Sequence, residues 1–155
     1  MKKSKIVGIV VICMCVIICI FIIKGNNGSK TIDGLFKRLT RAINNTDSQA
    51  IIKCFPEFMQ KQLPALSNKS MEEFHNKVGD ISFDIIRRSS IEFEDIENEI
   101  NSQYNCNIKL ERCALVECKY HDDFGAEIFE VIKIDGRWYL CYISHFPNPI
   151  QYFAE

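Results

Sequence analysis

The segment A-E-I-F-E-V-I-K-I-D-G-R-W-Y-L-C-Y-I, residues 126–143, decides how this chain folds. Its two halves are rich in β-branched and aromatic side chains, which favour β-strands. Asp135-Gly136 separates the halves, and an Asp-Gly pair favours a tight type I′ turn because glycine readily adopts positive φ. The segment therefore predicts a β-hairpin with strands over 126–134 and 137–143, to which the rest of the chain adds strands and helices.

Patterns upstream of the hairpin predict one α+β domain. Alternating side chains predict two further strands, over 81–91 and 108–120. Apolar residues at helical spacing predict helices over 31–45, 47–55, 57–63, 70–78 and 93–104. A domain of this length can bury one core. We therefore expect a mainly antiparallel sheet covered by the helices of residues 33–78.

The N-terminal run Ile6–Ile23 contains no charge and no proline. As a helix it is about 27 Å long, close to the thickness of the hydrocarbon core. A cleavable signal peptide is the rival interpretation, but no small-x-small cleavage pattern follows the run. The pattern predicts a single-pass membrane protein: a cytoplasmic tail (1–5), a transmembrane anchor in the bilayer (6–23), a linker (24–30) and an extracytoplasmic domain (31–155).

Charge and cysteine content exclude some classes of function. A formal net charge of −1 argues against a nucleic-acid partner, which needs a basic surface. Eight cysteines occur, three of them in the apolar N-terminal run. The other five are Cys54, Cys106, Cys113, Cys118 and Cys141. An odd number without a C-x-x-C motif indicates neither a disulfide framework nor a zinc site. We expect most of them to be small buried side chains, and the spacing leaves open whether any are disulfide-bonded.

One carboxylate falls on a largely apolar strand face. A turn at Asp135-Gly136 pairs Glu130 with Cys141 and Ile132 with Tyr139. Glu130 is then a candidate pocket acid, partnered by Tyr139 or Arg112, because acid–base chemistry needs a carboxylate with a tuned pKa beside a hydrogen-bond donor. The alternative is an outward face that is only partly covered. That alternative is favoured, because charged side chains are seldom fully buried without a partner.

Two segments carry a resemblance to a known family. L-F-K-R-L-T-R-A-I-N-N-T-D-S-Q-A-I-I-K-C-F-P (35–56) and V-I-K-I-D-G-R-W-Y-L (131–140) resemble the nuclear-transport-factor-two-like superfamily, especially its small membrane-anchored or secreted bacterial members. The resemblance implies a cone-like domain, in which helices pack into the hollow of a curved antiparallel sheet and leave a pocket. The superfamily includes isomerases, dehydratases and transport adaptors, so the fold alone constrains function little.

Two hypotheses of function follow. The first is a non-catalytic binding or interaction module beside the membrane, whose partner is an envelope protein or a small apolar molecule. The second is an isomerase- or dehydratase-like enzyme that uses Glu130 in the cone. The first is favoured, because no second group stands at a fixed spacing to complete an acid–base pair. No metal ligand set and no cofactor motif is found, so we expect neither.

Overall fold

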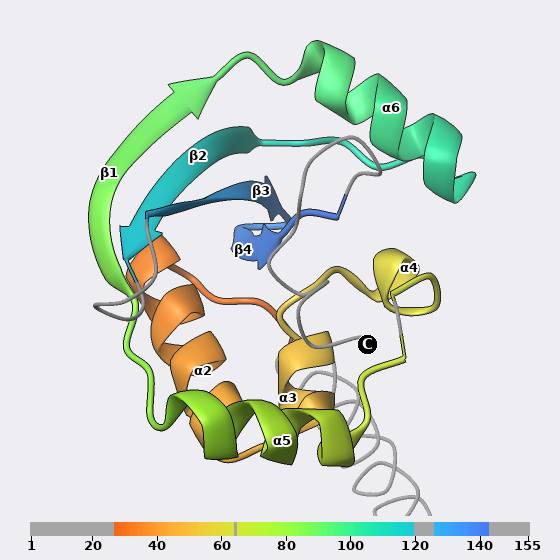
Figure 1. The fold of residues 1–155 in the computed structure, drawn as a ribbon. Helices are drawn as coiled ribbons and strands as arrows, with labels where there is room; N and C mark the ends of the chain where they lie inside the picture. Colours follow the sequence, from red (N-terminus) through yellow and green to blue (C-terminus); the bar gives the residue numbers. More distant parts are fainter. Residues whose placement is uncertain (1–26, 64, 120–125, 143–155) are drawn as a thin grey trace, which may run out of the picture.

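The computed structural model describes residues 27–63, 65–119 and 126–142 as an α+β domain (Figure 1). The helices are α2 (Ile32–Asn44), α3 (Ser48–Ile52), α4 (Glu57–Gln60), α5 (Asn68–Val78) and α6 (Glu94–Tyr104). The strands are β1 (Asp84–Ile91), β2 (Arg112–Lys119), β3 (Glu127–Ile134) and β4 (Arg137–Leu140). The α+β class and the four strands expected from the sequence are thereby confirmed.

The four strands form one antiparallel sheet in the order β1-β2-β3-β4. The hairpin has the predicted register, with Ile132 opposite Tyr139, and the Cys141 N–H donates to the Glu130 carbonyl at 2.9 Å. Asp135 and Gly136 have φ values of 49° and 74°, as a type I′ turn requires. The turn therefore sets the pairing of β3 and β4.

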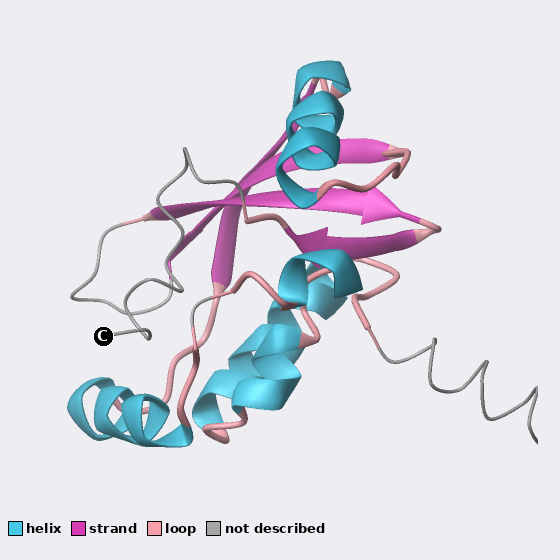
Figure 2. Cartoon of the chain, turned by 90° about the vertical axis from the view of Figure 1, so that its right-hand side faces the viewer, coloured by secondary structure: helices cyan, strands magenta, loops and turns pink. Residues whose placement is uncertain are grey.

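The helices lie on two sides of the sheet. Figures 1 and 2 show α2, α3 and α5 on one side and α6 on the other. Helix α2 begins where the Thr31 hydroxyl accepts a hydrogen bond from the Gly34 N–H at 3.0 Å. On the other side, the Tyr104 ring of α6 packs edge-on against Phe58, and its hydroxyl donates to the Tyr142 carbonyl. Both faces of the sheet are therefore covered, at least in part.

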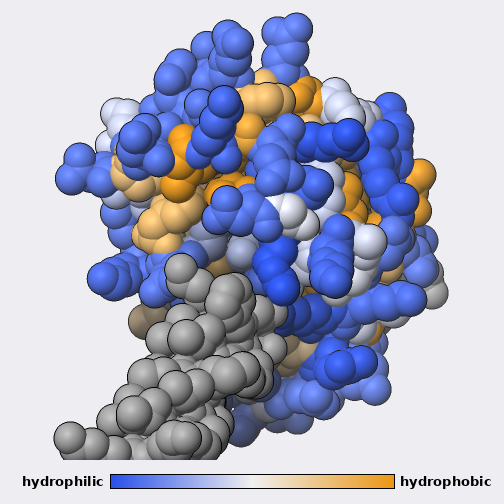
Figure 3. Space-filling model, turned by 180° about the vertical axis from the view of Figure 1, so that it is seen from behind, coloured by the Kyte–Doolittle hydropathy of each residue, from blue (hydrophilic) through white to orange (hydrophobic). Residues whose placement is uncertain are grey.

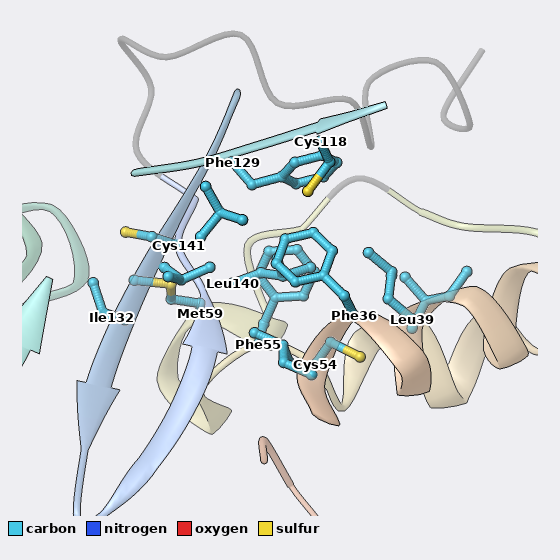
Figure 4. Packing of buried hydrophobic residues seen from close by; sticks show 14 of the residues in the cluster. Phe36, Leu39, Cys54, Phe55, Met59, Cys118, Phe129, Ile132, Leu140 and Cys141 are labelled. Carbon is cyan, nitrogen blue, oxygen red and sulfur yellow. The ribbon is translucent and has the colours of Figure 1, made fainter. Parts of the chain in front are cut away.

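Three aromatic rings join the main elements of the core. Phe36 of α2, Phe83 and Phe129 of β3 meet edge to face, with centroids 5.2 to 5.5 Å apart. Figure 4 shows Phe36 and Leu39 reaching from α2 toward the strand side chains Phe129 and Cys118. Edge-to-face rings gain about 0.5–1.5 kcal/mol beyond the area that they bury.

Two strands begin later than the sequence predicts, because helix side chains bind the backbone in front of them. The Asn44 side chain donates to the Ile81 carbonyl and accepts from the Ile81 N–H, both at 3.0 Å, so β1 begins at residue 84 rather than 81. On α6, Asn101 accepts from the Ile108 N–H at 2.8 Å and Glu97 accepts from the Leu110 N–H at 2.6 Å. The second strand therefore begins at residue 112 rather than 108.

The membrane part of the fold prediction is corrected. The predicted anchor, Ile6–Ile23, lies outside the described residues, and none of the helices within them has the length and apolar character that a bilayer crossing requires. The described helices are short, and α2 is amphipathic, with one face buried in the core. This finding contradicts the predicted transmembrane helix, the single-pass membrane location and the extracytoplasmic placement, and none of them is carried further.

Replacing Asn44 with alanine should destabilise the fold. The substitution leaves the N–H and C=O of Ile81 without their side-chain partners, and Ile81 is only 4% exposed. Each unsatisfied buried group costs about 1–3 kcal/mol, so the loss of two partners should lower the free energy of unfolding by about 2–6 kcal/mol in urea denaturation. Asn98→Ala on the exposed side of α6 is the matched control and should change it by less than about 0.5 kcal/mol. Equal effects of the two variants would contradict the role of Asn44.

Candidate functional site

An open cleft lies between α2 and the start of β1. Its volume is about 570 Å³, within the usual size of ligand sites. Helix α2 contributes Asp33, Lys37 and Arg41, which are four residues apart and therefore lie along one side of the helix. The opposite wall is formed by residues 82–85 and by Arg88. We call this site the α2–β1 cleft.

The cleft has unpaired positive charge on its α2 wall. Arg88 forms an ion pair with Asp33 across the cleft. Within the part of the chain that the structure describes, neither Lys37 nor Arg41 has an ion-pair partner, and both side chains are exposed. Asp84 is the remaining carboxylate of the lining. Two cations of α2 are thus available to an anionic group of a ligand.

The apolar part of the cleft comes from the aromatic core. Phe36 is buried and Phe83 is partly buried, and both line the cleft. Their centroids are 5.5 Å apart with an interplanar angle of 69°. Ile85 adds aliphatic surface from β1. The cleft therefore combines an apolar surface with two cations, which suits a ligand that has both an apolar part and an anionic group.

Glu130, the acid singled out from the sequence, is buried rather than placed on an outward face. Its residue is 8% exposed, and the Cys113 thiol donates to its carboxylate Oε1 at 3.4 Å. Burial raises the pKa of Glu130, the Cys113 hydrogen bond partly offsets this, and the charge of Glu99 raises it further. Cys113 and Cys141 interact electrostatically with Glu130 and with each other. Glu130 thus belongs to a buried cluster of carboxyl and thiol groups.

The structure does not bring the two predicted partners to Glu130. The Tyr139 ring lies against Gly28, where an added Cβ would stand 2.5 Å from Tyr139 Cε1. Burial raises the pKa of Tyr139, but the charges that act on it are those of other residues. Arg112 is exposed next to Cys113 on β2, so its side chain points to the other face of the strand. The sequence did not predict Cys113 as the partner of Glu130, because the two residues meet only through the pairing of β2 with β3.

The described cysteines have the structural character expected of them. Five are free and four of these are buried, namely Cys54, Cys113, Cys118 and Cys141. Burial raises the pKa of Cys54 and of Cys118 to about 12, and it also raises the pKa of Cys113 and Cys141. The thiols are therefore protonated at neutral pH, and a protonated thiol is a poor nucleophile and metal ligand. The expectation that most are buried is confirmed.

The buried acid and the open cleft lie in different places. Glu130 lines neither the α2–β1 cleft nor a second cleft of about 450 Å³, beside Gly28 and Arg38. In that second cleft Arg38 donates to the Gly28 carbonyl at 3.1 Å, so its cation already has a structural role. The rear face in Figure 3 is mostly hydrophilic, with apolar patches between hydrophilic residues. The α2–β1 cleft is therefore the better candidate for binding.

Comparisons of this chain with protein-family models, curated proteins and solved structures find no match. The resemblance to the nuclear-transport-factor-two-like superfamily therefore stays a prediction. The candidate site rests on the geometry of the cleft alone.

Glu130→Gln should stabilise the protein at neutral pH. Because the folded-state pKa of Glu130 is raised, folding favours the protonated acid, and this stability is lost as pH rises above the unfolded pKa, near 4.5. Glutamine keeps the acceptor for Cys113 and removes the buried charge. The melting temperature should therefore rise at pH 7.5 and change little at pH 4.0. At pH 7.5 the gain in the free energy of unfolding is about 1.4 kcal/mol for each pH unit by which the folded-state pKa of Glu130 exceeds its unfolded-state pKa. Glu127→Gln, on the same strand, is the control; a lower melting temperature of Glu130→Gln at pH 7.5 would contradict the prediction.

Proposed function

We propose that this protein is a non-catalytic binding module whose α2–β1 cleft holds a ligand with an anionic group and an apolar part. Lys37 and Arg41 would bind the anionic group, and the rings of Phe36 and Phe83 would contact the apolar part. The sequence predicted a small apolar ligand. Because Lys37 and Arg41 line the cleft, we now expect this ligand to carry a negative charge as well. The two classes of contact lie within one cleft, which supports a single ligand that uses both.

The observation that carries this proposal is the separation of the buried acid from the cleft. Acid–base catalysis requires a titratable group within hydrogen-bond reach of the substrate. Glu130 is 8% exposed, its carboxylate accepts from Cys113, and it does not line the cleft. The cleft in turn offers exposed charges over apolar side chains, which is an arrangement for recognition. Binding therefore fits the geometry better than turnover.

The enzyme hypothesis has less support. It requires Glu130 to stand beside a phenol or a second acid that faces a substrate, as in sites that stabilise a developing oxyanion. The neighbour that donates to Glu130 is instead the Cys113 thiol, whose pKa is itself raised by burial. A buried pair of this kind favours a structural role for Glu130.

The proposal can be tested with three aromatic compounds that share one apolar body. Phenylpropionate is an anion, phenylpropanol is neutral and phenylpropylamine is a cation. In titrations followed by amide NMR shifts, the anion should bind at least about tenfold more tightly than the other two, equivalent to about 1.4 kcal/mol. Shifts should centre on α2 and the start of β1, and binding should weaken between about 50 mM and about 500 mM salt.

Paired charge reversals provide the control for this experiment. Lys37→Glu with Arg41→Glu should weaken phenylpropionate binding at least about tenfold, because attraction becomes repulsion. Lys61→Glu with Lys77→Glu makes the same change in net charge at exposed lysines outside the cleft and should leave binding unchanged. Equal loss in both double variants, or equal binding of all three compounds, would overturn the proposal. Turnover of any of the compounds that Glu130→Gln abolishes would favour the enzyme hypothesis.

A further inference from the structure

The two edges of the sheet differ in whether other described segments form hydrogen bonds with them. The outer edge of β4 is closed by other parts of the chain: Ser29 and Trp138 exchange two backbone hydrogen bonds of 2.9 and 2.6 Å, and the Leu140 N–H donates to the Cys54 carbonyl at 2.9 Å. Strand β1 is the outermost strand at the other end (Figure 1). Among the described residues, its backbone forms hydrogen bonds with β2 alone. Its outward N–H and C=O groups are therefore open to another strand.

The α2–β1 cleft runs beside this open edge. Ile85 and Arg88 of β1 line the cleft, whereas Ile86 between them does not and is 58% exposed. Neighbouring side chains of a strand point to opposite faces, and a register irregularity between Ile85 and Arg87 brings Ile85 and Arg88, which are three positions apart, to the same side. The open edge thus has unpaired cations of α2 on one side and an exposed aliphatic side chain on the other.

The charges on β1 do not block the edge. Charged side chains commonly protect an edge strand from pairing with another chain. Here Arg87 pairs with Glu117 at 3.3 Å, and Arg88 pairs with Asp33. Both arginines are thus held by carboxylates of the protein itself, and an incoming strand would meet the unpaired Lys37 and Arg41 instead.

We propose that the ligand of the cleft is an extended segment of a partner protein, which adds to β1 as a fifth strand of the sheet; this inference rests on the proposed binding function. Successive side chains of a strand point to opposite faces. A segment in which acidic and apolar residues alternate would direct its acidic side chains into the cleft, with their carboxylates at Lys37 and Arg41 and their methylene groups over Phe36 and Phe83. Its apolar side chains would lie on the side of Ile86. Backbone hydrogen bonds to β1 supply affinity, and the cleft supplies specificity. The stretch from Asp84 to Arg88 spans about 17 Å, which suits a partner segment of about five to seven residues.

Backbone methylation tests this strand addition. The probe is a fluorescent, capped heptapeptide, E-V-E-V-E-V-E, titrated into the whole chain by fluorescence anisotropy. Two further peptides carry N-methyl groups on all valines or on all glutamates after the first. In an added strand alternate N–H groups face β1. One methylated peptide should therefore lose at least about tenfold in affinity, and the other should stay within about threefold of the parent peptide. Equal effects of the two methylated peptides would overturn strand addition.

Sequence and protein controls complete the test. The peptide E-E-V-V-V-E-E has the same composition without alternation and should bind at least about tenfold more weakly. Lys37→Glu with Arg41→Glu should also weaken binding of the alternating peptide, and so should Ile86→Ser, whereas Lys61→Glu with Lys77→Glu should not. If phenylpropionate binds the cleft but the alternating peptide does not, strand addition fails while the proposed function stands. If neither binds, the proposed function fails as well.

Discussion

The contact of three rings, Phe36, Phe83 and Phe129, is the interaction on which the rest of the structure depends. It joins α2, the segment that leads into β1, and β3, which are far apart in the sequence. The sheet buries its inner face against α2 only if these rings interdigitate, since protein interiors tolerate few voids. Two of the rings also form the apolar surface of the cleft. The shape of the candidate site is therefore set by the core beneath it.

Hydrogen bonds from helix side chains determine where the sheet ends. The Asn44 side chain on α2 binds both the N–H and the carbonyl of Ile81. In the same way, the Asn101 side chain on α6 accepts from the Ile108 N–H and donates to the Ile108 carbonyl at 3.1 Å. A buried backbone group must find a partner, and here an amide side chain replaces a neighbouring strand. The helices therefore do more than cover the sheet: they also limit the length of its strands. Ser82 and Phe83 consequently lie before β1, where they line the cleft.

The sequence predicted local structure better than contacts between distant segments. Asp135-Gly136 determines the register of β3 and β4, so the pairing of Ile132 with Tyr139 could be predicted. The neighbour of Glu130 could not be, because Cys113 meets it through the pairing of β2 with β3, and the connection of several residues between these strands sets no register. The cleft could not be predicted either, since its walls come from segments more than forty residues apart. The predicted membrane anchor fell on residues outside those described.

The closed edge of β4 has a consequence for the order in which the chain can fold. Arg137 Nη1 donates to the Asn27 carbonyl at 3.2 Å, across 110 positions of sequence. Ribosomes add about 5–20 residues per second, so Arg137 is synthesised roughly 5–20 s after Asn27. Closing so long a loop also slows the search for native contacts. This edge of the sheet can therefore form only after β4 has been synthesised, and until then the nascent chain exposes the surfaces that these contacts cover.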